Sequence, residues 1–264
     1  MQKLLQFNKF PNIKNNLSKL ENPPEKLFYI GNTGLLEKFK IAVVGTRNPN
    51  QYTKNITASL VKSLSKYAVI ISGGAIGVDS IAHINSFPNT IMISPSSLDI
   101  IYPKENKKMI QNITNEALII SEYENKYHPK RHSFLERNRI VIAISDMVIL
   151  PQGDLNSGTS SSARYAINLN KPIFTIPQRY NESKLTNSLL AQNKAKAIYN
   201  IDDFMREHFK DSINKIQNNS DEILDFCKDS PSFEVALEKF GNKILEYEFR
   251  GLLIREANII RTKC

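Results

Sequence analysis

The residues best suited to chemistry lie between Ser72 and His83, where the chain reads SGGAIGVDSIAH. Glycines at positions 73, 74 and 77 let the backbone turn tightly and approach a ligand, because no Cβ stands in the way. A helix that follows such a turn directs its free N–H groups and its positive dipole end into the same space. The segment therefore predicts a phosphate-binding turn, for a nucleotide or for a nucleic-acid backbone, formed by Ser72, Gly73, Gly74 and Ala75.

Two further segments have the composition of an anion site. Arg47 closely follows Gly45, and a guanidinium there can make charge-assisted hydrogen bonds to phosphate that a lysine makes less specifically. The alternative is a structural ion pair with a carboxylate such as Asp79, which would otherwise orient a base or a sugar hydroxyl, or cap the next helix. The second segment offers hydroxyl and N–H groups at an expected helix start, where they serve an anion, an N-cap or both. It comprises Ser157, Gly158 and Thr159.

Residues 127–139, YHPKRHSFLERNR, surround one phenylalanine ring with basic side chains. This composition suits single-stranded nucleic acid, because cations neutralise its backbone and a ring stacks on a base. Arg131 and Phe134 share one face if the segment is helical. The alternative is that Phe134 belongs to the core. His128 and His132 have the spacing of metal ligands, but a proline lies between them and no third ligand is evident, so we expect no metal site. The candidate binding residues here are Arg131, Phe134, Arg137, Asn138 and Arg139.

The charge of the chain favours a polyanionic partner. Its 264 residues carry a formal net charge of +9, and the pI is about 9.4. An excess of this size is typical of proteins that bind nucleic acid. The alternative is a lysine-rich surface that only maintains solubility.

Several classes of protein are disfavoured by what the sequence lacks. Its two cysteines, Cys227 and Cys264, form no spaced cluster that would indicate a disulfide framework or a zinc site. No signal-peptide core and no apolar run of membrane-spanning length occur, so we expect a cytoplasmic protein without membrane contact. The chain has no P-loop motif and no GxGxxG after its first expected strand, so we expect no nucleotide cofactor.

The elements that must position these residues follow from six short apolar runs. Each is rich in Ile and Val and ends at a turn residue, as strands covered on both faces do. Helix-like segments separate them, which predicts an α/β, Rossmann-like, doubly wound and mostly parallel sheet. Such sheets gather the loops after their strands at one edge, where ligands bind. The runs are residues 41–45, 68–72, 90–94, 117–121, 147–151 and 172–177.

The remaining composition suggests four regions. Residues 1–39 are polar and are expected to form an irregular N-terminal extension, followed by the Rossmann-like DNA-binding core at 40–210. A polar linker is expected at 211–222. Residues 223–264 predict short helices and a hairpin, as in a winged-helix module. This module is rich in glutamate, so a contact with protein is as well supported as a contact with DNA.

An ordered series of blocks in this chain resembles the DprA/Smf family, DNA processing protein A of bacteria. The blocks extend over about residues 22–205, and one glycine loop alone would carry far less weight. Ile76 departs from the family pattern, in which many members have a polar or basic residue. The blocks are GTR (45–47), SGGAIGVDSIAH (72–83), LDIIYPKEN (98–106), ISEY (120–123), ERNRIVIAIS (136–145) and SGTSSSARYA (157–166).

The resemblance implies a function in natural transformation. Members of the family bind incoming single-stranded DNA, protect it and help load the RecA recombinase onto it. They have a Rossmann-like core, act as cytosolic homodimers and are not known as enzymes. The resemblance further implies that the DNA lies across a basic pocket formed here by Arg47, by Ser72, Gly73, Gly74 and Ala75, and by Arg131 with Phe134.

Two other functions remain open at this point. One is a nucleoside-monophosphate phosphoribohydrolase, similar to the LOG or lysine-decarboxylase-like family, whose PGGxGTxxE block supplies a glutamate for glycosidic cleavage. Here Ser162 or Ala163 stands near the position where that carboxylate is needed. The other is a nucleotide-sensing regulatory module, which would explain the loops but leave the charge of +9 unexplained.

Overall fold

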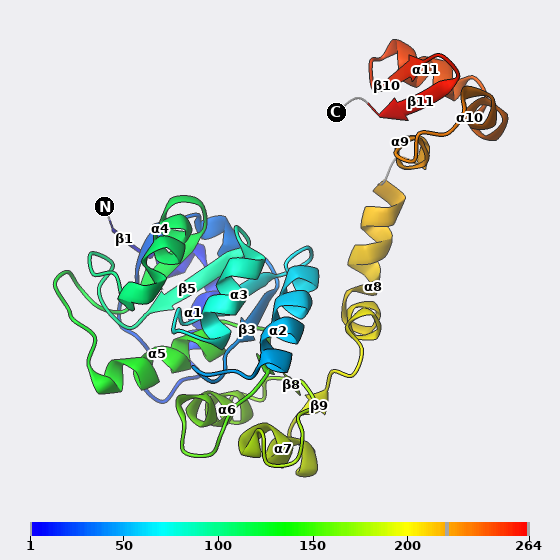
Figure 1. Cartoon of the computed structure of the whole chain (residues 1–264). Coiled ribbons are helices and arrows are strands. Elements are labelled where there is room, and N and C mark those ends of the chain that lie inside the picture. Colours follow the sequence, from blue (N-terminus) through cyan, green and yellow to red (C-terminus); the bar gives the residue numbers. More distant parts are fainter. Residues whose placement is uncertain (1, 220–221, 263–264) are drawn as a thin grey trace. The chain divides into compact units, whose positions relative to one another are not determined.

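The computed structural model describes residues 2–219 and 222–262, in two compact units (Figure 1). The larger unit comprises residues 1–205 and contains the sheet, and the smaller comprises residues 206–264. No helix within the described residues is long and apolar enough to cross a bilayer.

The predicted strands all form, and they pair in parallel. They are β3 (Lys40–Val43), β4 (Val69–Ser72), β5 (Thr90–Ser94), β6 (Leu118–Ser121), β7 (Met147–Leu150) and β8 (Ile173–Thr175). In the described part of the chain these strands belong to a nine-stranded sheet of order β1-β2-β6-β5-β4-β3-β7-β8-β9, in which β9 (Lys196–Ala197) also pairs in parallel. The Rossmann-like, mostly parallel sheet is therefore confirmed.

The expectation that residues 1–39 are irregular is wrong. Strands β1 (Lys3–Leu4) and β2 (Phe28–Gly31) extend the sheet in antiparallel pairing beyond β6. Between and after them lie η1 (Phe7–Lys9), α1 (Pro11–Leu17) and η2 (Thr33–Glu37). The reason is that isolated apolar side chains of this segment, among them Leu5, Ile13 and Leu27, join the main hydrophobic core. Their spacing among polar residues hides this pattern in the sequence.

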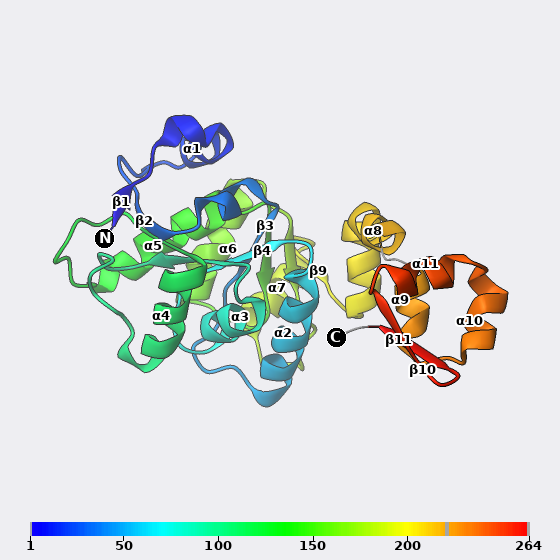
Figure 2. The same ribbon diagram turned by 90° about the horizontal axis from the view of Figure 1, so that it is seen from above.

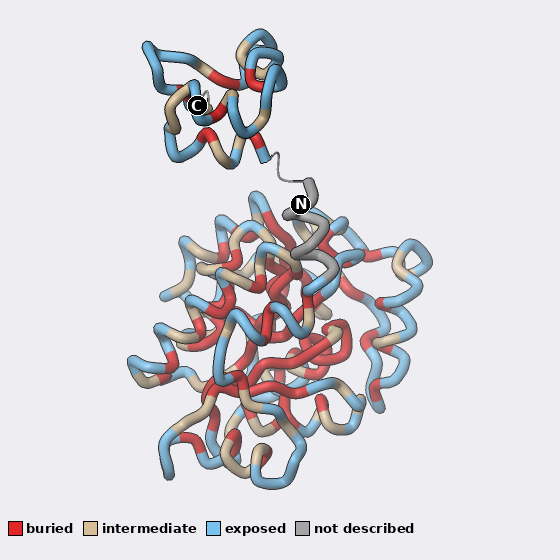
Figure 3. Tube along the Cα trace, turned by 90° about the vertical axis from the view of Figure 1, so that its right-hand side faces the viewer, coloured by how far each residue is buried: buried red, intermediate tan, exposed pale blue. Residues whose placement is uncertain are grey.

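Helices cover both faces of the sheet (Figure 2). Helices α2 (Gln51–Leu64), α3 (Val78–Ser86) and α4 (Lys107–Glu116) lie on one face, and α5 (Arg131–Ala143) and α6 (Gly158–Asn168) lie on the other. The central strands between these layers are buried along their length (Figure 3). This double cover explains their continuous apolar composition. Helix α7 (Lys184–Ala191) and the short η3 (Lys104–Asn106) complete the unit.

The strand order creates a crevice at the carboxyl end of the sheet. From β3 the chain first builds outward through β4 and β5, and later returns to β3 on its other side with β7. The loops after β3 and β7 consequently diverge, and ligands of such folds bind at this point. Two hydrogen bonds nevertheless link the two loops. Thr46 N donates to Gln152 O at 2.9 Å, and Asn50 N donates to Gln152 Oε1 at 3.0 Å.

The smaller unit contains helices followed by a hairpin. Within its described residues, Ile223, Cys227, Ala236, Ile244, Leu253 and Ile260 form its own core. The order agrees with the expected short helices and hairpin, while the winged-helix assignment stays a prediction. Residues 211–219 of the expected linker continue helix α8, and residues 220, 221, 263 and 264 of the expected regions lie outside the described residues. Helix α8 (Ile201–Asn219) spans the boundary between the two units, and the elements that follow it are α9 (Glu222–Cys227), α10 (Phe233–Phe240), α11 (Lys243–Phe249), β10 (Leu253–Glu256) and β11 (Ile259–Thr262).

Candidate functional site

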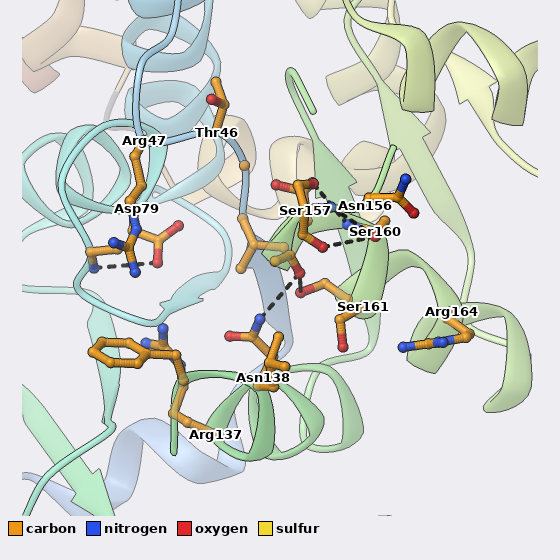
Figure 4. Close-up of a pocket in the computed structure, with 18 of the residues that line it drawn as sticks. Thr46, Arg47, Asp79, Arg137, Asn138, Asn156, Ser157, Ser160, Ser161 and Arg164 are labelled. Atoms are coloured by element: carbon orange, nitrogen blue, oxygen red, sulfur yellow. Dashed lines mark hydrogen bonds between the residues drawn. The ribbon is translucent and has the colours of Figure 1, made fainter. Parts of the chain in front are cut away.

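A cavity of about 870 Å³ opens where the loops after β3 and β7 diverge. The loop after β3, helix α5 and the start of α6 form its walls (Figure 4). Four arginines line it, and Asp79 is the acid among its described lining residues. The cavity therefore presents a concentrated positive charge, which suits a phosphate-bearing ligand. The arginines are Arg47, Arg131, Arg137 and Arg164.

The glycine turn between β4 and α3 is shaped by Asp79. Its Oδ2 accepts hydrogen bonds from Gly73 N at 3.2 Å and from Ala75 N at 3.4 Å. Burial raises the pKa of Asp79, while Arg137 and the bonds from the turn act in the opposite direction. These two N–H groups are thus engaged within the protein, while the phosphate-binding role predicted for the turn stays a prediction. Asp79 acts as an internal anchor of the turn.

The turn makes room for the guanidinium of Arg137. A Cβ at Gly73 would lie 1.5 Å from Nη1 of Arg137, so no larger residue fits there without moving the arginine. Arg137 is 5% exposed and donates from Nη1 to Ile93 O at 3.0 Å, whereas its buried Nε has no hydrogen-bond partner in the described structure. Burial lowers the pKa of Arg137 and the charge of Asp79 opposes this, so the guanidinium stays protonated. A fixed positive charge therefore lies at the floor of the cavity.

Phe134 packs between a cation and a second ring. The Cζ of Arg47 lies 5.4 Å from the centroid of the Phe134 ring, and the ring of Tyr102 lies 5.5 Å from it at an angle of 59°. Phe134 is half-buried and faces both cavities of this region. The alternative of a core phenylalanine is therefore not supported. The described structure contains no ion pair between Arg47 and Asp79, so Arg47 stays available to a ligand.

The start of α6 supplies the opposite wall. Ser157 caps the helix, because its hydroxyl accepts from Ser160 N at 3.3 Å while Ser160 Oγ donates to Ser157 O at 2.7 Å. Asn138 of α5 joins the two walls by donating from Nδ2 to Gly158 O at 3.3 Å. The capping alternative thus holds for the Ser157 side chain. The positive end of the α6 dipole nevertheless faces the cavity, along with the hydroxyl-bearing Thr159.

Three predicted residues line neither the large cavity nor the smaller one beside it. Ser72 is fully buried and donates from Oγ to Val43 O at 2.6 Å, because it closes a strand inside the sheet. Gly74 has φ of 75°, and a Cβ there would meet the side chain of Met92. Arg139 lies on another side of α5, where a carboxylate is available, and pairs with Glu122 at 2.6 Å.

The structure brings together most of the other candidates. Arg47, Ala75, Arg131, Phe134, Arg137, Asn138, Ser157, Gly158 and Thr159 all line the large cavity, and Gly73 lines a smaller one beside it. The prediction missed Thr46, Tyr102, Asn156 and Arg164, which also line these cavities. The block SGTSSSAR offered a signal for Arg164, since this residue falls six positions into α6. Within the described residues, no three His, Cys, Asp or Glu side chains gather as metal ligands would.

The positive charge resides in the larger unit. Residues 1–205 carry 25 Lys and Arg against 15 Asp and Glu, a net charge of +10. Residues 206–264 carry 10 Lys and Arg against 11 Asp and Glu, a net charge of −1. The excess that favours a polyanionic partner thus belongs to the unit that holds the cavity.

Comparison with known proteins identifies the family. The family described as DNA recombination-mediator protein A matches residues 5–209. The chain belongs to this family. A curated relative in the DNA recombination-mediator protein A family, DNA processing protein DprA from Streptococcus pneumoniae, is 33% identical over 182 residues, which is 65% of this chain and 64% of that protein. DprA from Bacillus subtilis is 32% identical over 197 residues, 72% of this chain and 66% of that protein. The chain therefore spans just under two thirds of the length of these relatives.

Solved structures of the same family share the fold. DNA processing protein A from Helicobacter pylori, described for its mode of binding single-stranded DNA, is 49% identical with a TM-score of 0.76, covering 80% of this chain and 97% of that chain. DprA from Streptococcus pneumoniae is 32% identical with a TM-score of 0.68, covering 73% of this chain and 69% of that chain. The resemblance to the DprA/Smf family is thus confirmed.

Proposed function

We propose that this protein binds single-stranded DNA in the arginine-lined cavity, protects DNA taken up in natural transformation and helps load RecA onto it. The observation that carries the proposal is the combination of four arginines with the half-buried Phe134 ring in one cavity. The DNA-binding relative from Helicobacter pylori supports it, because nearly all of that chain is covered at 49% identity. The proposed binding residues are those predicted candidates that line the two cavities.

A single strand suits this site better than a duplex. The arginines neutralise successive phosphates, and the ring of Phe134 offers a face on which an unpaired base stacks. In a duplex, both faces of each base are already covered by neighbouring bases. Ring stacking therefore favours strands whose bases are free.

We further propose that the protein has no catalytic activity and that the phosphoribohydrolase alternative does not apply. Glycosidic cleavage depends on carboxylates that face the sugar. Among the described residues of the large cavity, the carboxylate is that of Asp79, which is 5% exposed and holds the glycine turn. Ser162, which lines the cavity near the position where the enzyme family has its glutamate, carries a hydroxyl instead.

The partners of the protein follow from the same family. We propose a cytoplasmic homodimer that contacts RecA, without a cofactor and without membrane contact. The C-terminal region, proposed to be a winged-helix-like module, has a net charge of −1 over residues 206–264, which favours a protein contact over DNA binding for this part. Light scattering tests the homodimer, and strand exchange on coated DNA tests the loading of RecA.

A titration tests the central proposal. The protein is titrated with labelled single-stranded and double-stranded oligonucleotides between 50 and 200 mM salt, and release of ribose 5-phosphate from AMP is assayed in parallel. If three phosphates are contacted, the affinity for single strands falls by about 20-fold over this range, because each contact contributes about −0.7 to the logarithmic slope. Preference for the single strand without release of base supports the proposal. Release of ribose 5-phosphate without DNA binding would refute it.

A further inference from the structure

The start of α6 forms one end of the large cavity, on the wall opposite the glycine turn. Gly158 and Thr159 are the first two residues of this helix, so their N–H groups have no carbonyl of a preceding helical turn to bind. Among the described residues neither N–H has another partner. We call the part of the cavity that is lined by Gly158, Thr159, Ser161 and Arg164 the α6 end.

Two hydroxyl groups at the α6 end are buried and unpartnered. Thr159 and Ser161 are each 5% exposed and line the cavity, and neither hydroxyl has a hydrogen-bond partner within the described residues. The methyl group of Thr159 packs against Gly153, because a Cβ built there would lie 2.6 Å from Thr159 Cγ2. This packing leaves the hydroxyl of Thr159 on the cavity side. Buried hydroxyls without partners are unfavourable, so these two point to a ligand that accepts hydrogen bonds.

The neighbouring serines find their partners within the protein. Ser157 donates from Oγ to Asp154 O at 2.5 Å, and Ser160 donates from Oγ to Ser157 O at 2.7 Å. Ser162 donates from Oγ to Gly158 O at 3.4 Å. The two unpartnered hydroxyls are therefore exceptions within their own segment.

The charge at the α6 end is positive and meets no competing acid. Arg164 lies three positions after Ser161 and lines the cavity, and its guanidinium is directed toward Ser161 (Figure 4). In the described part of the chain Arg164 takes part in no ion pair. The nearest acid in the sequence, Asp154, does not line the cavity and accepts from Lys184 N at 3.3 Å. Hydrogen-bond donors and a cation thus converge here without a carboxylate between them.

We propose that the α6 end binds a phosphate monoester, the group that ends a phosphorylated strand or a mononucleotide, in preference to the internal phosphate of a strand. A monoester has three terminal oxygens and carries roughly 1.5–2 negative charges at pH 7, whereas an internal phosphate has two such oxygens and one charge. Two N–H groups, two hydroxyls and a guanidinium match three oxygens better than two. The proposal rests on the proposed DNA binding only where the monoester ends a strand, because a free mononucleotide fills the same site.

Competition against a labelled 20-residue oligothymidylate, read by fluorescence anisotropy, tests the proposal with the full chain. The unlabelled competitors are the 20-residue strand with two hydroxyl ends, the same strand with a 5′-phosphate or with a 3′-phosphate, and a 22-residue strand with two hydroxyl ends. The longer strand has the charge of the phosphorylated ones, since two further internal phosphates equal one monoester. A phosphorylated strand is expected to compete about tenfold better than either hydroxyl-ended strand, the effect of one charge-assisted hydrogen bond.

Free thymidine 5′-monophosphate and thymidine separate the two sources of the monoester. Displacement of the labelled strand by millimolar thymidine 5′-monophosphate, but not by thymidine, assigns the site to mononucleotides as well. A preference for a phosphorylated strand without such displacement assigns the site to strand ends.

Two variants test the hydroxyls of the α6 end. Thr159→Val keeps the methyl group that packs against Gly153 and removes the hydroxyl, and Ser161→Ala removes the other one. Each is expected to reduce the ratio of the affinities for phosphorylated and hydroxyl-ended strands from about tenfold to about threefold or less. A general loss of DNA affinity does not enter this ratio. Thr114→Val removes a threonine hydroxyl from α4, lines neither cavity and is expected to keep the tenfold ratio.

The outcomes separate this inference from the proposed function. Equal competition by all four strands, with no displacement by thymidine 5′-monophosphate, overturns the monoester site, as does a ratio that both hydroxyl variants leave unchanged. A 22-residue strand that competes as well as the phosphorylated strands also overturns it, because charge alone then explains the effect. If the labelled strand does not bind at 50 mM salt, the proposed function is overturned. Calorimetric titration then decides on the monoester site, which binding of thymidine 5′-monophosphate but not of thymidine supports and binding of neither overturns.

Discussion

Replacing Arg47 by alanine tests whether this side chain contributes to DNA binding rather than to the stability of the fold. The side chain is exposed, and its described contact is with the ring of Phe134, at 5.4 Å from the centroid. A cation–π contact at an exposed site stabilises by about 0.5–1 kcal/mol. The core unit of Arg47→Ala is therefore expected to melt within about 4 °C of the wild type, given about 2–4 °C per kcal/mol for a unit of this size.

The expected loss of DNA affinity is larger than this loss of stability. Hydrogen bonds from a charged group contribute about 1.5–3 kcal/mol, and removing Arg47 also releases the ring on which a base stacks. A total loss of about 2–3 kcal/mol corresponds to an increase in Kd of about 30- to 150-fold. The logarithmic salt slope is expected to become shallower by about 0.7, since one phosphate contact disappears.

Fluorescence anisotropy with a labelled 20-residue oligothymidylate at several salt concentrations measures both quantities. Lys62→Ala is the matched control, because Lys62 is an exposed cation of the same unit in the last turn of α2 and lines neither cavity. Arg47→Lys is expected to retain the salt slope and to lose part of the affinity, since lysine keeps the charge without the planar fork. Binding by Arg47→Ala within twofold of the wild type, or equal losses in Arg47→Ala and Lys62→Ala, would refute the reasoning.

Three other perturbations test the structural assignments. Gly73→Ala is expected to destabilise the core unit by about 1–3 kcal/mol and to weaken DNA binding, because the new Cβ collides with the buried guanidinium; urea unfolding and anisotropy measure both effects. Gly158→Ala is the control for stability alone and should unfold as the wild type does, because its new Cβ would lie 4.0 Å from its nearest neighbour, Asn138 Nδ2. Arg139→Ala is expected to destabilise the core unit by about 3–5 kcal/mol, because Glu122 then loses the buried arginine with which it pairs. The variant is expected to bind DNA as the wild type does, so a large binding defect in a variant that stays folded would contradict the assignment. Burial lowers the pKa of His83 from 6.5 to about 3, so stability is full above pH 6.5 and falls by about 1.4 kcal/mol per pH unit below it. Urea unfolding of the core unit at pH 7 and pH 5 measures this loss, and His83→Leu should flatten it; an equal slope in this variant would disprove the assignment.

The strands of the core were predictable from local composition. Residues 68–71 and 91–93, for example, are apolar without interruption because helices cover both faces of β4 and β5. The glycine turn was predictable as a special backbone for a similar reason, since φ of 87° at Gly77 favours glycine over other residues. Each of these features is encoded within a few consecutive residues, so the sequence by itself determined them.

The direction of each arginine on α5 was decided by the tertiary structure. Arg137 and Arg139 are two residues apart and so point about 200° apart around the helix. Both flank the face that carries Arg131 and Phe134, so helical periodicity alone does not predict which of the two arginines reaches the cavity. The glycine turn admits Arg137 to the floor of the cavity, whereas Glu122 binds Arg139 on the other side. The residues that fix the direction of each arginine, Gly73 for Arg137 and Glu122 for Arg139, are distant from it in the sequence.

The same limit applies to the glycine turn and to the smaller cavity beside the large one. The turn has the composition of a phosphate site, but Asp79, a few residues further on, engages two of its N–H groups once α3 begins. Tyr102 and Phe134 are 32 positions apart in the sequence, yet their ring centroids lie 5.5 Å apart. The sequence thus determined the elements, the charge and the family, through patterns short enough to read along the chain. The tertiary structure decided which polar groups are satisfied within the protein and which remain for a ligand, because hydrogen bonding and burial depend on neighbours that are distant in sequence.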